Sequence, residues 1–228
     1  MLAAALCLAL IAPQADPATY LADLTRLLRT DWPHNRTVYI VCHGHSVPAG
    51  YFRTPTVSTF EAYPHLLHER LAKRFPHAVI NVIVTAIGGE NAEGGAKRFA
   101  ADVLAVHPDL VTIDYSLNDR GIGLVRARKA WVQMIQEAQN ANVKLILLTP
   151  TPDQSAKLDD PQDPLNLQAD QVRDLAKACN VGLADSLAGF KAKLSAGIKL
   201  PSLMSQVNHP NRQGHEIVAD ALARWFPS

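Results

Sequence analysis

The chain has 228 residues, of which 48% are hydrophobic and 19% are charged, and its formal net charge at pH 7 is +1. This composition is typical of a globular chain that buries a sizeable core, and the length suits a single domain. The near-neutral charge, with no long run of one sign, excludes a nucleic-acid-binding stripe and a polybasic membrane patch.

The chain begins with twelve apolar residues, MLAAALCLALIA, a segment too short to span a bilayer as a helix. With the small residues up to Ala15 it is typical of the apolar core and cleavage site of a signal peptide, although the basic residues that normally come first are missing. We therefore expect residues 1–15 to be a signal peptide and residues 16–228 to be a single secreted or periplasmic domain. The alternative is a buried N-terminal helix in a cytoplasmic protein.

Short apolar runs alternate with helical patterns along the rest of the chain. The runs are nearly continuous, as expected for strands that are covered on both faces, and they lie at 37–42, 79–84, 110–115, 143–148 and 181–184. Apolar residues at helical spacing predict helices at 17–29, 59–74 (bent at Pro64), 96–104, 124–138, 164–179 and 218–225. This order predicts a three-layer α/β/α sandwich around a flavodoxin-like, five-stranded parallel sheet.

Unusual polar segments follow these strands. In open parallel sheets, ligands bind outside the carboxyl ends of the strands. The segments expected at those ends include HGHSVPAGY (43–51), TAIGGENAEGG (85–95), SLNDRG (116–121) and SQVNHPNRQGH (205–215). They would bring a serine hydroxyl, an imidazole and hydrogen-bond donors to one edge of the sheet, which is what acyl transfer requires.

Four of these motifs resemble those of the SGNH, or GDSL-like, hydrolase family. GHSVPAGY is similar to the GDS motif, IGGENA supplies the glycine, SLND is similar to GxND, and QVNHPN is similar to DxxHPN. They occur in the family's order between about residues 37 and 226. The resemblance implies the SGNH-type α/β/α fold and ester hydrolysis without a cofactor.

The resemblance also implies a role for each motif residue. Ser46 would be the nucleophile and His209 the general base. The backbone N–H groups of Ser46 and Gly89, with the side-chain amide of Asn118, would form the oxyanion hole. Taken alone, Ser46 is also typical of a helix N-cap, and the other three are typical of turns or exposed loops.

The chain departs from the family pattern at three positions. His45 replaces the aspartate of GDS, and Ser116 replaces the glycine of GxND. Gln206 replaces the aspartate three residues before His209, which removes the carboxylate that normally orients the imidazole.

The missing carboxylate leaves three possibilities for His209. The side-chain oxygen of Gln206 or a backbone carbonyl could accept a hydrogen bond from Nδ1 of His209, which is the arrangement we expect. A carboxylate from another loop, such as Asp153 or Asp185, could take the missing position. Alternatively, the protein could be a weak or inactive hydrolase.

A metal site is the alternative suggested by His43 and His45, because an H-x-H pair at a strand end can bind zinc. A hydrolytic zinc site normally has at least a third protein ligand, and no suitable motif supplies one. We therefore expect no metal and interpret both histidines as part of the loop architecture.

The loops between the motifs are polar and short, which favours a polar ligand such as a sugar over a lipid. We expect Tyr51, Arg53 and Asn91 to bind the substrate, and we expect small acyl esters, acetyl above all, of O-acetylated carbohydrate. Alternatives are a lysophospholipase or thioesterase type of enzyme, an O-acyltransferase, and a non-catalytic glycan-binding relative. The partner would be a small-molecule or glycan ester, without nucleic acid and without a stable membrane span.

Overall fold

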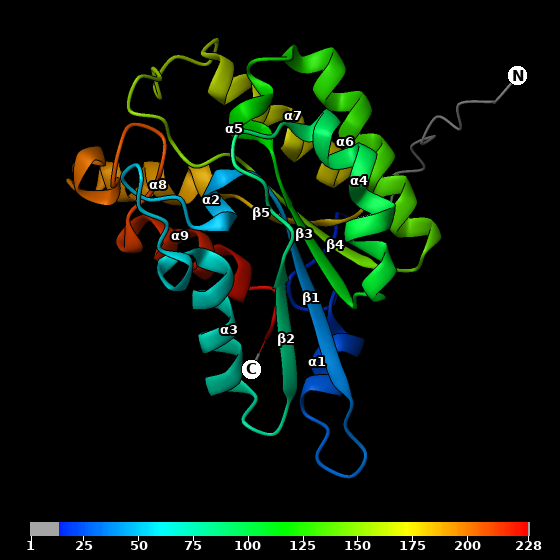
Figure 1. Ribbon diagram of the computed structural model, residues 1–228. Helices are drawn as coiled ribbons and strands as arrows, with labels where there is room; N and C mark the ends of the chain where they lie inside the picture. The colour runs from blue at the N-terminus through cyan, green and yellow to red at the C-terminus, as the bar shows by residue number, and fades with distance from the viewer. Residues whose placement is uncertain (1–13, 228) are drawn as a thin grey trace, which may run out of the picture.

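The centre of the molecule is a five-stranded parallel sheet with the strand order β2-β1-β3-β4-β5 (Figure 1). The computed structural model describes residues 14–227, so almost all of the expected signal peptide lies outside the described residues. This strand order is flavodoxin-like, which confirms the predicted fold class. The strands are β1 (Thr37–Gly44), β2 (Val79–Val84), β3 (Leu110–Asp114), β4 (Lys144–Leu148) and β5 (Gly182–Ala184).

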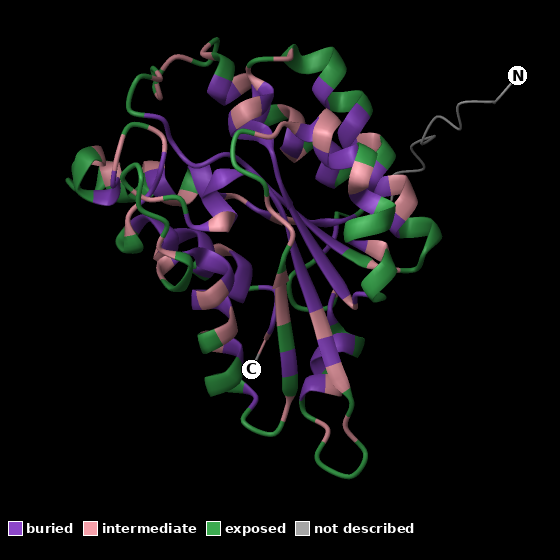
Figure 2. Ribbon diagram, in the orientation of Figure 1, coloured by how far each residue is buried: buried purple, intermediate pink, exposed green. Residues whose placement is uncertain are grey.

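Burial along the strands explains why their sequences are nearly continuous apolar runs. All five residues of β3 are buried, and so are four of the five residues of β4, because helices cover both faces of the sheet. Strand β2 lies at one edge of the sheet, and two of its apolar residues, Val79 and Val84, are exposed (Figure 2). The predicted strand positions are therefore correct to within one or two residues at each end.

The helices form the two outer layers, and each layer packs on its own hydrophobic cluster (Figure 1). One face of the sheet is covered by α1 (Ala22–Leu28), α3 (Tyr63–Arg74), α8 (Ser186–Ser195) and α9 (Arg212–Ala223). The other is covered mainly by α4 (Ala92–Asp102), α6 (Gly123–Asn140) and α7 (Pro164–Ala178). None of the helices in the described part of the chain is both long and apolar enough to cross a membrane.

The helix predictions differ from the structure at several helix ends, and the helix expected at 218–225 begins at Arg212. The helix expected at 17–29 begins only at Ala22, after a series of turns. The helix expected at 59–74 is two elements, the 3₁₀ helix η1 (Thr59–Glu61) and α3, and Pro64 lies in the first turn of α3, where its missing N–H is tolerated. Helix α8 was not predicted, because its apolar residues do not follow a clear helical period.

Short helices at the carboxyl ends of two strands carry two of the four motif residues, Ser46 and Asn118. Helix α2 (Ser46–Ala49) follows β1 after one residue, and α5 (Ser116–Asp119) follows β3 after one residue. The 3₁₀ helices η2 (Leu104–Val106) and η3 (Leu200–Leu203) complete the connections. This compact arrangement places the first and third motifs side by side, because β1 and β3 are neighbours in the sheet.

Candidate active site

Ser46 and His209 meet at the carboxyl edge of the sheet, although 163 positions separate them in the chain. The Nε2 atom of His209 lies 3.0 Å from the Oγ atom of Ser46. Both residues are largely buried, with 6% and 7% of their surface exposed. The N-cap of α2 is His45, so the hydroxyl of Ser46 is not used to cap the helix.

The turn that presents Ser46 depends on a close approach of two strands. Gly44 is paired with Asp114 of β3, and a Cβ atom at position 44 would lie 2.5 Å from the carbonyl oxygen of Asp114. No residue other than glycine fits there without a shift of the backbone. Directly afterwards, the N–H of His45 donates to the same carbonyl at 3.3 Å, and the chain then turns into α2. Ser46 is therefore held at the end of the strand by backbone contacts.

The imidazole of His209 is oriented by a backbone carbonyl. Its Nδ1 atom lies 3.0 Å from the carbonyl oxygen of Phe52, which can only accept a hydrogen bond. In the neutral ring, Nδ1 therefore carries the proton and Nε2 presents a lone pair to Ser46. Burial lowers the pKa of His209 below its ordinary value, the Phe52 carbonyl partly opposes this, and the ring is neutral at pH 7. This is the tautomer that a general base requires.

Gln206 lies beside this arrangement but makes no hydrogen bond to the His209 ring. Its Oε1 atom accepts from the backbone N–H of Thr54 at 3.0 Å and from the Thr54 hydroxyl at 3.3 Å. Thr54 is two residues beyond Phe52, so this contact ties the histidine loop to the segment that carries the accepting carbonyl. Of the arrangements considered for His209, the structure shows the backbone carbonyl.

The two carboxylates considered as replacements are bound elsewhere. Asp185 forms an ion pair with Arg173 at 2.8 Å, and Asp153 forms one with Arg120 at 2.7 Å. Burial opposes ionisation of both carboxyls, but their hydrogen bonds to arginine and to nearby donors lower each pKa below its ordinary value. Neither carboxylate makes a hydrogen bond to His209.

One hydrogen bond joins the two loops that carry the proposed oxyanion donors Gly89 and Asn118. The Nδ2 atom of Asn118 in α5 donates to the carbonyl of Glu90 at 2.8 Å, next to Gly89. Because an amide group has two N–H donors, one remains for a ligand. Gly89 has a φ of +79°, in the left-handed region, and a Cβ atom there would meet nothing within 4 Å. Glycine is therefore required by backbone conformation rather than by space.

Asp119 links the elements behind Asn118. One carboxylate oxygen accepts from the N–H of Ala92 at 2.8 Å, and the other accepts from Nε1 of Trp131 at 2.7 Å. Its backbone carbonyl accepts from Gln168 at 3.0 Å. Burial raises the pKa of Asp119 to about 6, although both hydrogen bonds favour the charged form. The carboxylate thus fixes α5 against α4 and α6, and the backbone carbonyl links it to α7.

Glu90 holds the loop that carries Gly89. Its carboxylate accepts from Nε of Arg98 at 3.0 Å and from the hydroxyl of Tyr115 at 2.8 Å. The Tyr115 hydroxyl also lies 3.1 Å from Nε2 of His43. Glu90 belongs to the polar segment 85–95 expected at a strand end, whereas Arg98, Tyr115 and Phe52 were not predicted as parts of the site. Phe52 contributes a backbone atom, so its side chain carries no signal.

His43 and His45 have different partners. His43 bonds the Thr85 hydroxyl at 2.8 Å, and burial lowers the pKa of its ring to about 4. The ring of His45 instead faces Val47 and Asp114. In residues 14–227, no group of three or more histidine, cysteine or acidic side chains is arranged to hold a metal ion.

The three residues expected to bind substrate lie in different settings. Tyr51 is 40% exposed, and its ring centroid lies 5.9 Å from that of His209, at the mouth of the site. Arg53 donates to the carbonyl of Ser205 at 3.4 Å and thereby contacts the histidine loop. The side-chain oxygen of Asn91 caps α4 by accepting from two backbone N–H groups. Of the three, Tyr51 is the one beside the reacting groups.

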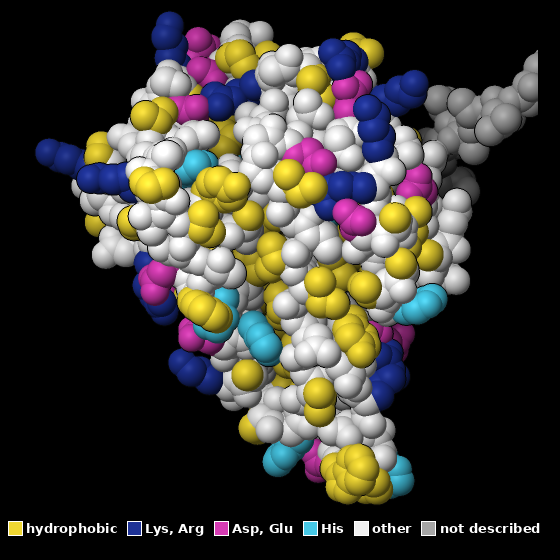
Figure 3. All heavy atoms as spheres, in the orientation of Figure 1, with side chains coloured by type: hydrophobic (Ala, Val, Ile, Leu, Met, Phe, Trp, Pro, Cys, Tyr) yellow, Lys and Arg dark blue, Asp and Glu magenta, His cyan; other side chains and the backbone are white. Residues whose placement is uncertain are grey.

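Apolar side chains are also exposed near this edge, notably Ile87, Val57 and Val207. Val57 pairs with Tyr51 in an isolated β-bridge, and Val207 accepts a backbone hydrogen bond from Gln154. Figure 3 shows hydrophobic side chains spread down the middle of one face, with charged side chains to both sides. The face drawn in Figure 3 is therefore mixed in character, with no dominant charge.

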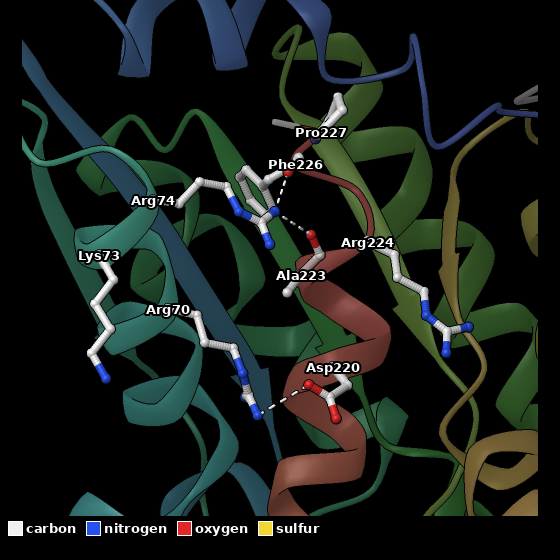
Figure 4. Close-up of a pocket in the computed structure, with 8 residues that line it drawn as sticks. All are labelled: Arg70, Lys73, Arg74, Asp220, Ala223, Arg224, Phe226 and Pro227. Carbon is white, nitrogen blue, oxygen red and sulfur yellow. Dashed lines mark hydrogen bonds and ion pairs between the residues drawn. The ribbon is translucent and has the colours of Figure 1, made fainter.

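A basic pocket lies between the C-terminal ends of α3 and α9, with a volume of about 780 Å³ (Figure 4). Helices in this fold run antiparallel to the strands, so these ends lie at the edge opposite to Ser46. Arg74 donates to the carbonyls of Ala223 and Phe226, and Arg70 pairs with Asp220 at 3.1 Å. These contacts provide donors for backbone carbonyl groups at the C-terminal end of α9. The pocket plays no part in the site around Ser46.

Comparisons with known proteins identify the family and the fold. Residues 42–217 match the model of the GDSL-like Lipase/Acylhydrolase family, and the chain belongs to that family. The family and the SGNH-type fold inferred from the four motifs are thereby confirmed.

Solved structures show the same fold at low sequence identity. The acetylxylan esterase Axe2 from Geobacillus stearothermophilus is 21% identical, with a TM-score of 0.73 over 84% of this chain and 94% of that chain. A two-domain esterase, CEX, active on acetylated mannans, is 18% identical, with a TM-score of 0.70 over 90% of this chain and 51% of that chain. The comparison with curated proteins finds no match.

Proposed function

We propose that this protein is a serine esterase that hydrolyses small acyl esters, acetyl above all, of O-acetylated carbohydrate. The observation that carries the proposal is the 3.0 Å contact between Ser46 and a His209 ring whose tautomer is set by Phe52. A hydroxyl beside an unprotonated, oriented imidazole is the arrangement that activates a serine nucleophile.

In the first step, Oγ of Ser46 attacks the carbonyl carbon of the ester while its proton passes to Nε2 of His209. The carbonyl oxygen becomes an oxyanion, which the backbone N–H groups of Ser46 and Gly89 and the second N–H of Asn118 stabilise. The bond to the alcohol oxygen then breaks, and His209 returns the proton to that oxygen. The products are a free alcohol and an acyl group on Ser46.

In the second step, water replaces the alcohol. His209 takes a proton from the water, whose oxygen attacks the acyl carbon, and the same three donors hold the second oxyanion. The bond to Oγ breaks, the proton returns to Ser46, and the carboxylic acid leaves. The lowered pKa of His209 keeps its ring neutral at pH 7, so it is ready for both transfers.

The carbohydrate substrate is supported by the setting of the site. Ser46 lies at a surface rim that combines an exposed tyrosine, Tyr51, with polar loops, which suits a sugar ring that stacks on an aromatic face. Axe2 is an acetylxylan esterase and CEX is active on acetylated mannans, and both share the fold. These relatives support acetylated polysaccharide as the substrate class.

The test is hydrolysis of p-nitrophenyl esters across acyl lengths, followed by acetate release from acetylated xylan and acetylated mannan. We expect a preference for acetyl and loss of nearly all turnover in Ser46→Ala. A rise in kcat/KM toward long acyl chains would contradict the deacetylase proposal in favour of a lipase-type enzyme. Unchanged turnover in Ser46→Ala would remove the serine esterase proposal itself.

We also propose that the protein is exported, on the basis of the apolar segment within residues 1–15. Expression of the full chain in a bacterial host, followed by N-terminal sequencing of the periplasmic fraction, tests this. We expect a mature chain that begins near Asp16. An intact N-terminus found only in the cytoplasm would contradict it.

A further inference from the structure

A second imidazole lies beside the nucleophile. The Nδ1 atom of His45 is 3.4 Å from Oγ of Ser46, on the interior side of the serine. The opposite ring nitrogen, Nε2, is 3.4 Å from Oδ1 of Asp114. His45 and Asp114 are essentially fully buried, with 0% and 1% of their surface exposed. Asp114, His45 and Ser46 thus form a line of three polar side chains that leads from the core of the sheet to the site.

The hydrogen bonds of His45 determine its tautomer. Its Nδ1 atom accepts from the backbone N–H of Val47 at 3.3 Å, so this nitrogen must present a lone pair. In a neutral ring the proton then lies on Nε2, which faces Asp114. Within the described residues, neither Nε2 of His45 nor Oδ1 of Asp114 has a hydrogen-bond partner that satisfies strict geometry. A buried donor and a buried acceptor that face each other are each other's natural partner.

We propose that His45 and Asp114 are positioning residues of the esterase site, in which Asp114 holds His45 in its neutral Nε2–H tautomer so that the Nδ1 lone pair faces Ser46. The inference rests on the proposed function, because it concerns the reactivity of Ser46. With this tautomer, both imidazoles around Oγ are acceptors, and no donor occupies the lone pairs that attack the ester. The opposite tautomer would donate from Nδ1 to Oγ and would oppose the N–H of Val47.

The other titratable groups around this pair do not replace Asp114. Burial and the nearby Asp114 carboxylate raise the pKa of Tyr63 on α3 well above its ordinary value, and burial raises that of Cys42 on β1 to about 12. Both groups are therefore neutral. The carboxylate oxygens of Asp119 on α5 are used by Ala92 and Trp131.

The same geometry explains why the first motif has a histidine where the family has an aspartate. An aspartate at position 45 would add a second carboxylate next to the buried Asp114, and like charges in a buried setting repel strongly. A neutral imidazole instead offers a donor to Asp114 and an acceptor to Val47. We therefore expect residues 45 and 114 to be coupled, so that His45→Asp is tolerated better together with Asp114→Asn than alone.

The direct test is ¹⁵N NMR of the full chain labelled at histidine, with His45→Asn used to assign the signals. At pH 7 we expect the His45 ring to show an unprotonated Nδ1 and a protonated Nε2, and we expect this pattern to be lost in Asp114→Asn. A protonated Nδ1 in the unmodified protein, or an unchanged pattern in Asp114→Asn, would overturn the proposal. This readout does not depend on esterase activity.

The kinetic test compares three variants on p-nitrophenyl acetate. His45→Asn keeps an oxygen acceptor near the position of Nδ1 and should stay within about tenfold of the original kcat. His45→Leu fills the space without an acceptor, and Asp114→Asn removes the charge; each should lower kcat by about 10- to 100-fold with little change in KM. Labelling of Ser46 by a fluorophosphonate should slow in parallel.

Asp185→Asn is the matched control, because it also removes a carboxylate at a strand end but one that is paired with Arg173. It should lower the melting temperature and leave kcat unchanged. Equal kcat in His45→Asn and His45→Leu, or an original kcat in Asp114→Asn, would overturn the positioning role. Failure of the proposed function is distinguished from this outcome by Ser46→Ala, which would then retain activity.

Discussion

The two sides of Ser46 are held by different kinds of interaction. On the histidine side, the partners are neutral: the Phe52 carbonyl orients His209, and the Gln206 amide oxygen holds Thr54. On the oxyanion side, the partners are carboxylates, that of Asp119 buried and that of Glu90 partly buried. Glu90 binds an arginine and a tyrosine behind Gly89, and Asp119 binds a backbone N–H and a tryptophan behind Asn118.

The difference shows which task needs a charge in this site. Orienting an imidazole requires only an acceptor in the right place, and a carbonyl supplies one. Fixing the oxyanion loops requires several elements to be joined at once, and a carboxylate with two accepting oxygens can do this. What the histidine side lacks is a negative charge next to the imidazolium that forms during the reaction. Loss of the family aspartate at position 206 therefore changes the electrostatics of the base more than its geometry.

The largest expected effect is removal of the base. His209→Ala should lower kcat/KM on p-nitrophenyl acetate by about 10³-fold or more, because no other oriented imidazole faces the substrate side of Ser46. In the unmodified enzyme, kcat/KM should fall at low pH as His209 becomes protonated, and this acid limb should lie below pH 6.5, since burial lowers the pKa of His209. In the His209→Ala variant, the residual activity should show no such acid limb. A limb above pH 7 would show that a carboxylate stabilises the imidazolium after all.

The next effect concerns the oxyanion side. Asn118→Ala should lower kcat by about 10²- to 10³-fold with a small change in KM, as expected when one oxyanion donor is removed. Asn91→Ala is the matched control, because its side-chain oxygen caps α4 and the substitution should lower the melting temperature without lowering kcat. A large rise in KM for Asn91→Ala would instead support its predicted contact with substrate.

The acid sensitivity of the fold should come in part from the network behind the oxyanion loop. Burial lowers the pKa of His43 in the folded protein to about 4, while the unfolded chain binds a proton near pH 6.5. The unfolded state therefore binds more protons between these values, and stability falls as pH falls. From pH 7 to pH 5 the loss from His43 is about 2 kcal/mol. Urea denaturation at both pH values measures this loss in the free energy of unfolding. The His43→Asn variant should lose less stability between pH 7 and pH 5 than the unmodified protein.

The smallest effect is expected at Gln206. Gln206→Ala removes the acceptor for both donors of Thr54 and should lower kcat by roughly tenfold or less, because a neutral hydrogen bond contributes about 1 kcal/mol and these two act on His209 only through the segment that carries Phe52. Gln206→Glu keeps an accepting oxygen at the same length and should restore most of the turnover. If Gln206→Ala were as damaging as His209→Ala, the orientation of the base would depend on Gln206 and not on the Phe52 carbonyl.

Much of the fold could be predicted from local patterns. The five apolar runs are all strands of one sheet, since a strand buried on both faces needs apolar residues throughout. The helices with a clear apolar period were also found, whereas α8, which lacks one, was missed. Helix ends were less accurate, as at α1, because tertiary packing decides how many residues of a turn become helical.

The sequence by itself determined the fold class, the family and the placing of Ser46, Gly89, Asn118 and His209 in loops that follow strands, because these depend on residue type and order along the chain. Only the tertiary structure decided how His209 is oriented and which carboxylates are occupied. Those answers depend on backbone atoms such as the Phe52 carbonyl, 157 positions away from His209, and on ion pairs such as that of Asp185 with Arg173. A backbone carbonyl is the same in every residue, so no side-chain pattern can reveal its role.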